Sequence, residues 1–200
     1  MTVAKEHREG RSLMREIRSQ HPGLREALLA DARVTAAHRG ERHEFHSRAD
    51  AVIQVLRLIW KSDAFLAQAL YRVKARLQAL GVPVLPRLAH RLGMAIAQVS
   101  IGDPVIVHPG VYLLHGQVVI DGITEIHSGA VIGPFVTIGL RAGDLVGPTV
   151  ERNVTIGTGA KVLGRLRVGA GARIGANAVV VDDVAEGTTA VGVPARALSA

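Results

Sequence analysis

The chain has 200 residues, a formal net charge of +7 at pH 7 and 48% hydrophobic residues. This length allows one domain or two small ones, and the apolar content is enough for a substantial core. Because the chain contains no cysteine, disulfides, thiolate zinc sites and cysteine nucleophiles are excluded. The basic charge favours an anionic partner, such as nucleic acid, acidic lipid or a phosphate-rich cofactor, without choosing between them.

The sequence has no pattern typical of a membrane protein. Its first residues are charged and lack the apolar region of a signal peptide. The later apolar stretches are interrupted by charged residues or prolines before they reach the roughly 20 residues that a bilayer span needs. We therefore expect no membrane span and a cytoplasmic protein.

Helical patterns dominate residues 1–98. We expect helices over residues 4–19 and 23–37, a polar connector over 38–47, and a short helix over 87–97. Between them, Asp50 is expected to cap a long helix that ends near Leu80, before Gly81. The polar stripe of this long helix is narrow, which indicates that it buries more than one face. Oligomer contacts would use the surplus apolar surface.

A repeat of six residues dominates the second half of the chain. Aliphatic side chains occupy every sixth position except that of Asp144, and these are Leu114, Ile120, Ile126, Ile132, Ile138, Val150, Ile156, Val162, Val168, Ile174 and Val180. This period fits neither an amphipathic helix nor a hairpin sheet. It is typical of a solenoid in which each flat face takes one hexapeptide and each coil buries the apolar row of its neighbour.

The repeat is interrupted twice. Upstream, the aliphatic residues Ile101, Val107 and Leu113 are also spaced by six, but each lies one position before the row that begins at Leu114. The phase of the repeat therefore slips by one residue beside His115. Downstream, residues 139–149 skip a place and are expected to form a loop that leaves the rod. Loops that leave a rigid scaffold often carry function, so both interruptions are candidate sites.

Four segments of the chain carry a resemblance to a known family. They read SDAFLAQALYRVKARL, LLHG, IGTGAKVLGRLRVGAGARIGANAVV and AVGVPAR. Over about residues 55–200 the sequence resembles the serine acetyltransferases, a branch of the hexapeptide-repeat acyltransferases. The resemblance implies an α-helical N-terminal region at 1–98 that serves oligomerisation, a catalytic left-handed parallel β-helix at 99–185, and a C-terminal tail at 186–200. It also implies a homotrimer or a dimer of trimers, with acetyl-CoA bound between neighbouring rods.

The resemblance also assigns the residues of an acetyl-transfer site. His115 matches the family's general base, and Leu114 stands where the family has an aspartate that holds serine. Ser100 stands in place of the aspartate that orients the base, and its hydroxyl is expected to hold the His115 ring more weakly than a carboxylate. Val146 and Gly147 stand where the family's loop carries an Arg-His pair for the acceptor. Because these charged groups are replaced, we expect serine to be a weaker acceptor than some larger or less charged alcohol.

Acetyl-CoA is the expected acyl donor, and no metal is expected. Arg165, Arg167, Arg173 and Arg196 are candidate contacts for its phosphates, since guanidinium groups suit phosphate recognition. For the first three of these, a solvated face is an equal alternative. From the resemblance, Gly157, Ala160, Gly175 and Ala176 are expected to give backbone contacts and clearance for the pantetheine arm.

Several alternatives remain at this point. His108 and His127 are alternative candidates for the base. The acceptor could be a sugar, an amino sugar or a biosynthetic intermediate, and the chain could instead be a non-catalytic trimeric scaffold. Nucleic-acid binding is disfavoured because aromatic residues for base stacking are only 3% of the chain.

Overall fold

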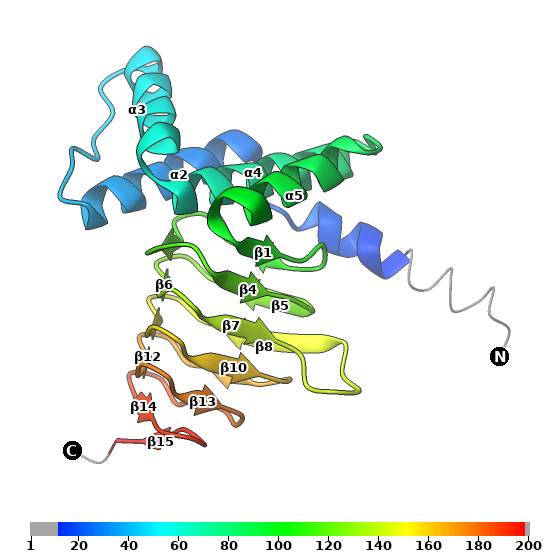
Figure 1. The fold of residues 1–200 in the computed structure, drawn as a ribbon, viewed down its shortest axis with the longest axis vertical. Coiled ribbons are helices and arrows are strands. Elements are labelled where there is room, and N and C mark those ends of the chain that lie inside the picture. Colours follow the sequence, from blue (N-terminus) through cyan, green and yellow to red (C-terminus); the bar gives the residue numbers. More distant parts are fainter. Residues whose placement is uncertain (1–11, 199–200) are drawn as a thin grey trace, which may run out of the picture.

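The computed structural model describes residues 12–198, as a rod of stacked coils with helices packed over one end (Figure 1). The first described residues, 12–19, are helical. They are followed by α2 (Leu24–His38), α3 (Arg48–Lys61), α4 (Asp63–Ala79) and α5 (Leu85–Ala97). The part of the expected first helix over residues 4–11 lies outside the described residues. Within 12–198, no helix is both long enough and apolar enough to cross a membrane.

The prediction of a single long helix from Asp50 to Leu80 is wrong, because Ser62 divides this segment into α3 and α4. The Ser62 backbone is extended, and its hydroxyl accepts a hydrogen bond from the Phe65 N–H at the start of α4. Ser47, not Asp50, caps α3 in the same way. Serine is among the preferred N-cap residues because its oxygen satisfies an N–H group that the helix leaves free. The break lets α3 project away while α4 lies across the end of the rod (Figure 1).

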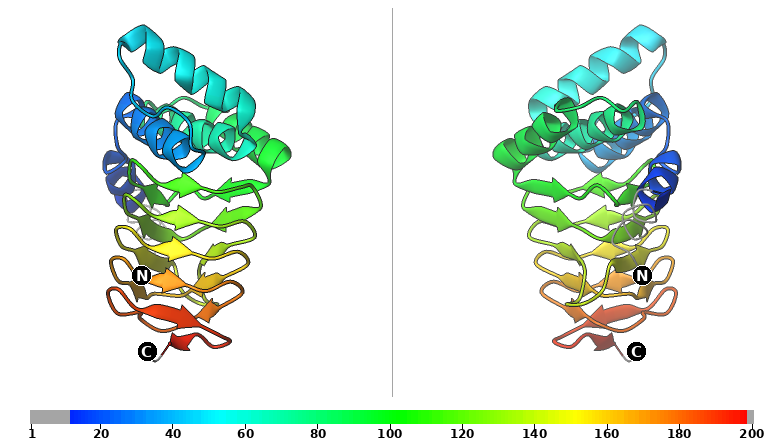
Figure 2. Two further views of the ribbon diagram at one scale, coloured as in Figure 1. Left: turned by 90° about the vertical axis from the view of Figure 1, so that its left-hand side faces the viewer. Right: turned by 90° about the vertical axis from the view of Figure 1, so that its right-hand side faces the viewer.

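The rod consists of three parallel sheets, and successive strands of each coil belong to successive sheets (Figure 2). The first sheet contains β1 (Val99–Ile101), β4 (Val118–Ile120), β7 (Thr137–Gly139), β10 (Lys161–Leu163) and β13 (Val179–Val180). The second contains β2 (Ile106–Val107), β5 (Ile123–Ile126), β8 (Val146–Val150) and β11 (Arg167–Val168). The third contains β3 (Tyr112–Leu113), β6 (Val131–Ile132), β9 (Thr155–Ile156), β12 (Arg173–Ile174), β14 (Thr189–Val191) and β15 (Arg196–Ala197). This arrangement confirms the fold class predicted from the sequence.

The aliphatic row points inward, as the six-residue period predicts, except at its first member. From Ile120 to Val180 its members are at most 2% exposed, and they form the core of the rod. Leu114, by contrast, is 42% exposed, and Leu113 takes the inward position beside Ile132. The face between Leu113 and Ile120 therefore has one extra residue, and the chain bulges at this corner.

The protruding loop comprises residues 140–145, which is shorter than the expected 139–149 (Figure 1). Gly139 still pairs with Leu163, and Val146 already pairs with Ile123 in the neighbouring coil. The backbone hydrogen bonds of a parallel ladder therefore hold both ends of the segment to the rod. At the other end of the chain, β14 continues the third sheet by pairing in parallel with β12, and β15 turns back antiparallel to β14.

Polar side chains of α4 cap the first coil. The carbonyl groups of this coil have no preceding strand to accept from, and buried carbonyls need a donor. The donors come from α4. Gln68 Nε2 donates to the Val111 carbonyl (2.9 Å), and the Tyr71 hydroxyl donates to the Val105 carbonyl (2.8 Å). Arg72 donates to the carbonyls of Val107 and His108, and Lys74 Nζ donates to that of Ile101 (2.6 Å). This explains why four polar side chains of one helix are almost completely buried.

Two ion pairs complete this cap, and the Arg72–Asp31 pair is buried, whereas the Asp103 side chain of the second pair is 53% exposed. Arg72 Nε lies 2.9 Å from the Asp31 carboxylate of α2, and the same carboxylate accepts the Gly110 N–H at 2.8 Å. Lys74 Nζ lies 3.0 Å from the Asp103 carboxylate, and burial lowers the pKa of this amine. The pairs join both helices to the first coil, so the helical region and the rod share one packed end.

Candidate active site at the first corner of the rod

The extra residue of the first coil places His115 on an exposed corner between β3 and β4. The side chain lies on an open cleft of about 430 Å³ between this corner and the helices. The cleft is lined by Arg39, Lys61, Ser62, Asp63, Ala64, Ile96, Ala97, Gln98, Leu114, His115, Gly116, Gln117, Pro134 and Phe135. The corner thus presents an imidazole to a cleft that is large enough for a small molecule.

Charged side chains of both signs reach this cleft from three helix ends. Arg39 follows α2, Lys61 ends α3, and Asp63 begins α4. Glu41 lies 3.2 Å from Arg39 Nε and 3.9 Å from Lys61 Nζ, so it compensates part of the positive charge. No sequence pattern predicts that these residues meet, because they are far apart in the chain and belong to no common motif. The Ser62–Asp63 capping signal was the one local indication that a helix begins here.

The expected acceptor residues differ in where they lie. Leu114 lines the cleft and is 42% exposed, and Phe135, at 57%, adds a second apolar side chain. Ser100 does not line the cleft, and among residues 12–198 no hydrogen bond joins it to His115. Val146 and Gly147 belong to β8 and also lie outside the cleft lining.

The structure gives Gly147 a packing role. A Cβ atom at this position would lie 2.1 Å from Thr124 Oγ1, far inside van der Waals contact. Thr124 is buried and donates to the Asp121 carbonyl at 2.7 Å, so it cannot easily turn away. The absence of a side chain at residue 147 therefore lets two coils approach, whatever its role toward an acceptor.

A column of residues with little side chain runs down the rod from the His115 corner. The N–H of Leu114 donates to Ile132, that of Gly133 to Ile156, and that of Gly157 to Ile174, so these positions stack coil upon coil. Gly175 and Ala176 continue the same corner one coil further along. A Cβ at Gly157 would lie 2.7 Å from the Ala176 nitrogen, so glycine is required for this spacing. Gly133 is buried, whereas Gly157 and Gly175 are partly exposed and Ala176 is exposed, so this edge of the rod is accessible along its lower part.

The other expected cofactor residues do not all belong to this column. Ala160 is completely buried and points into the core. Arg165 is exposed between β10 and β11, around the rod from the column. Arg196 lies in β15 of the third sheet, near the far end of the column, and its exposed guanidinium is 3.3 Å from the Asp182 carboxylate. The structure therefore aligns Gly157, Gly175 and Ala176 in one column below the His115 corner, two or three coils away from it.

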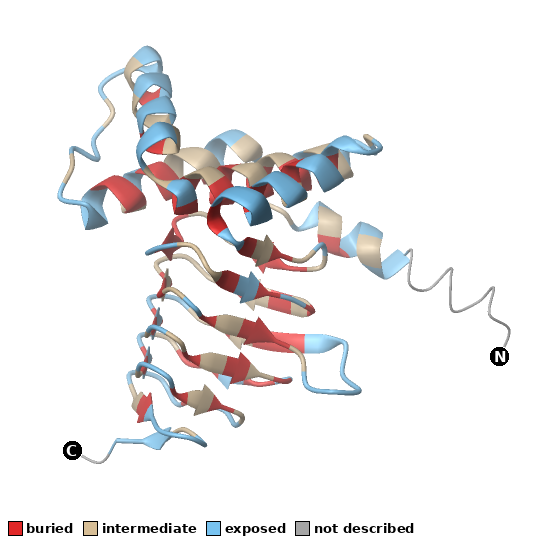
Figure 3. Cartoon of the chain, viewed as in Figure 1, coloured by how far each residue is buried: buried red, intermediate tan, exposed pale blue. Residues whose placement is uncertain are grey.

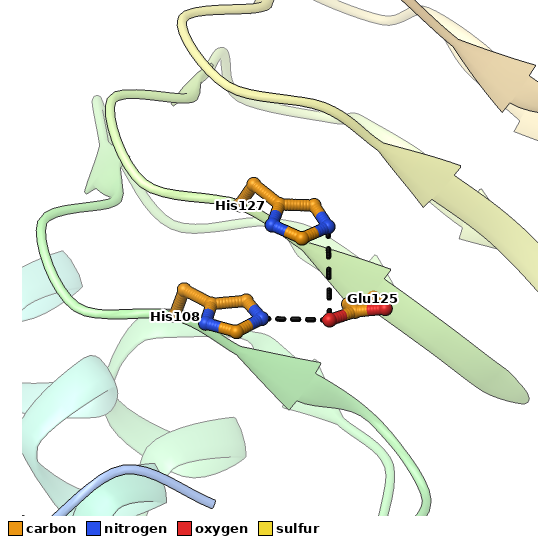
Figure 4. A group of neighbouring side chains, drawn as sticks. All are labelled: His108, Glu125 and His127. Carbon is orange, nitrogen blue, oxygen red and sulfur yellow. Dashed lines mark hydrogen bonds and ion pairs between the residues drawn. The ribbon is translucent and has the colours of Figure 1, made fainter. Parts of the chain in front are cut away.

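A second histidine cluster lies on another face of the rod (Figure 4). His108 follows β2 and His127 follows β5, and their rings stack with centroids 4.6 Å apart and an interplanar angle of 8°. Glu125 Oε1 lies 2.7 Å from His108 Nε2 and 3.6 Å from His127 Nε2. Neither histidine lines the His115 cleft.

Comparisons with known proteins converge on one group, although no family model matches the chain. A serine acetyltransferase of Helicobacter pylori is 37% identical over 133 residues, which are 64% of this chain and 77% of that protein. A serine acetyltransferase of Synechococcus elongatus is 36% identical over 143 residues, 67% of this chain and 56% of that protein. The chain thus spans little more than half the length of that relative.

Solved structures agree with the sequence comparison. The soybean serine acetyltransferase complexed with serine is 30% identical with a TM-score of 0.73, covering 90% of this chain and 71% of that one. A serine acetyltransferase in complex with CoA is 27% identical with a TM-score of 0.72, covering 94% of this chain and 75% of that one. These matches include both the helical region and the rod.

Proposed function

Because the chain belongs to the serine acetyltransferase family, we propose that it transfers the acetyl group of acetyl-CoA to the hydroxyl of serine or of a closely related small molecule, with His115 as the general base. The observation that carries this proposal is the position of His115, at the phase slip, on a cleft that also holds Arg39, Lys61 and Asp63. Solved relatives that bind serine and CoA support both substrates.

The proposed reaction needs no covalent enzyme intermediate. The acceptor oxygen attacks the thioester carbonyl while the His115 imidazole removes the hydroxyl proton. The carbon–sulfur bond then breaks, and the imidazolium returns the proton to the departing thiolate of CoA. The negative charge that develops on the carbonyl oxygen needs nearby donors, and the Gly116 N–H has no hydrogen-bond acceptor within residues 12–198. We assign this N–H to the oxyanion.

The charges of the cleft favour an acceptor of the amino-acid type. Free serine carries a carboxylate and an ammonium, and each loses hydration on binding unless an opposite charge replaces the water. In the proposed complex, Arg39 and Lys61 face the carboxylate, and Asp63 faces the ammonium. This set would replace the charged groups that the sequence lacks at Leu114, Val146 and Gly147. The exposed Leu114 and Phe135 support the alternative of a larger, less charged alcohol.

The glycine column is the proposed path of the pantetheine arm. It begins at the His115 corner and passes Gly157, Gly175 and Ala176, with coils about 4.8 Å apart. Arg196 lies near the far end of the column, where we propose that it contacts the phosphates of CoA. Arg165 and Ala160, from their positions, have weaker support as cofactor residues, and Ser100 stays a predicted positioning residue for His115.

We also propose that the protein works as a homotrimer or a dimer of trimers. The outer face of α3 is apolar yet exposed (Figure 3), with Val52 at 58%, Ile53 at 60% and Trp60 at 90%. Several exposed apolar side chains on one face of a helix favour association with another chain. The cytoplasmic location and the division into an oligomerisation region at 1–98, a catalytic rod at 99–185 and a tail at 186–200 stay predictions from the sequence.

The test is release of free CoA from acetyl-CoA with serine, other amino acids, sugars and simple alcohols as acceptors. Sedimentation of the same preparation gives its oligomeric state. We expect turnover with serine, and a serine rate on the order of 10 per second would contradict the sequence-based expectation that a larger or less charged alcohol is the better acceptor. Turnover only with a larger alcohol would replace serine by that acceptor. An absence of turnover with every acceptor, despite CoA binding, would identify a non-catalytic scaffold.

A further inference from the structure

We propose that His108, Glu125 and His127 form a binding site for a divalent transition-metal ion, with zinc as the representative ion. The site lies on the face formed by β2 and β5, separate from the His115 cleft (Figure 4). One ligand atom from each side chain lies within 4.8 Å of the other two. This inference does not depend on the proposed acetyl transfer.

The backbone of the rod places the three side chains on the same face. Val107 pairs with Ile126, so the residues that follow them, His108 and His127, lie side by side on adjacent coils. The His108 N–H donates to the Ile126 carbonyl at 2.8 Å, and the His127 N–H donates to Val150 at 2.9 Å. Glu125 shares the outward face with His127 because side chains alternate along a strand and Ile126 points inward.

To hold one ion, the Glu125 carboxylate must shift and the two imidazole rings must tilt toward a common point, because stacked rings with an interplanar angle of 8° direct their Nε2 lone pairs in parallel. The Nε2 atom of His108 points toward the Glu125 carboxylate at 2.7 Å, and that of His127 lies 3.6 Å from the same oxygen, across the stack (Figure 4). Zinc binds nitrogen and carboxylate oxygen at about 2.0–2.2 Å, so two ligands of one ion are about 3.3 Å apart. A shift of the Glu125 carboxylate oxygen away from His108 by about 0.6 Å, from 2.7 Å to about 3.3 Å, would bring these two atoms to the spacing of two ligands of one ion.

The donor set selects the class of metal. Two imidazole nitrogens and one carboxylate oxygen suit Zn²⁺, Co²⁺ or Ni²⁺, whereas Mg²⁺ and Ca²⁺ prefer oxygen ligands alone. All three side chains are partly exposed, with 32%, 40% and 26% of the His108, Glu125 and His127 side chains accessible, so an ion can enter from solvent. Three protein ligands leave a position for water.

Metal binding here would join the first two coils. His108 belongs to the first coil, and Glu125 and His127 belong to the second. An ion bound to the folded rod, but not to the unfolded chain, stabilises the fold in proportion to its affinity. We therefore expect zinc to raise the melting temperature of the protein as well as to bind it.

The test is calorimetric titration of the untagged full chain, freed of metal with EDTA, with zinc chloride and separately with magnesium chloride. We expect one zinc ion per chain at this site and no magnesium binding. The Glu125→Gln variant keeps the side-chain volume and should weaken zinc binding at least about tenfold, since even groups that only orient metal ligands are worth 10- to 100-fold. The double variant His108→Ala/His127→Ala should lose this binding and the zinc-dependent rise in melting temperature.

The matched control is His43→Ala, which removes an exposed histidine far from the cluster in sequence and should bind zinc as the unaltered protein does. Circular dichroism verifies that each variant is folded. If the double variant does not fold, the zinc affinity of the Glu125→Gln variant tests the proposal. Unchanged zinc affinity in Glu125→Gln and in the folded double variant would overturn the proposal, as would no zinc binding by the unaltered protein.

Discussion

The first coil of the rod differs from the coils that follow it. Below it, inward aliphatic residues repeat with little variation, and ladder hydrogen bonds hold each coil to the next. The first coil is capped by α4, contains one residue more than the period allows, and carries His108 and His115. In this molecule the buried charged groups, Asp31, Arg72 and Lys74, lie over the capped first coil, because a regular coil leaves only exposed outward positions for charge.

The largest effect is expected from removing the imidazole of the irregular corner. His115→Ala should lower the rate of acetyl transfer by about 100- to 10,000-fold, the usual loss when a general base is removed. CoA affinity should change little, because the glycine column lies below the corner. Steady-state assays of CoA release, together with equilibrium CoA binding, measure the two effects separately.

The control for this variant is His43→Ala, which should keep full turnover. If His115→Ala also kept full turnover, His115 would not be the general base. His108 and His127 would then be the next candidates.

The second prediction compares an ion pair of the capped end with one of the regular coils. Arg72 and Asp31 are 2% and 0% exposed, whereas the Arg167 side chain, 2.9 Å from Glu151, is 68% exposed. Arg72→Ala should lower the free energy of unfolding by about 3–5 kcal/mol, because it leaves a buried carboxylate without its partner. Arg167→Ala should lower it by about 1 kcal/mol or less, because water already screens the exposed pair.

Urea denaturation of both variants and of the unaltered protein measures this difference. A similarly small loss for both arginines would show that the capped end does not depend on its buried pair. The comparison between the first coil and the later coils would then lose its energetic basis.

The smallest expected effect is a pH dependence of stability at the capped end. Burial, together with the charges of Arg72 and Lys74, lowers the pKa of His21 from 6.5 to about 4. The unfolded chain therefore binds the proton more readily, so the stabilisation is complete above about pH 6.5 and is lost as the pH falls toward 4. The melting temperature should fall by on the order of a few °C between about pH 7.5 and about pH 5.

His21→Gln should reduce this dependence, and melting curves at both pH values measure it. The exposed His43→Gln is the control and should keep the dependence of the unaltered protein. An equal slope in the His21→Gln variant would assign the pH dependence to other groups.

The sequence alone was sufficient to predict the rod and the two places where its repeat is interrupted. A six-residue period is a local property, and the inward row from Ile120 to Val180 follows directly from it. The same reasoning located the corner of His115, whereas Gly157 and Gly175 were expected only from the family resemblance, and their stacking in one column appears only in the structure. It failed at Leu114, because two overlapping phases meet there and only packing determines which leucine points inward.

Tertiary structure decided what surrounds His115 and what closes the rod. Arg39, Lys61 and Asp63 meet at the cleft only because Ser62 divides the predicted long helix and redirects the chain. Likewise, Arg72 belongs to the polar stripe of the long helix expected from the sequence, yet it is buried because the first coil has carbonyl groups that no strand can satisfy. Periodicity records which face of an element is apolar, whereas the partners of a polar side chain depend on segments far away in the sequence.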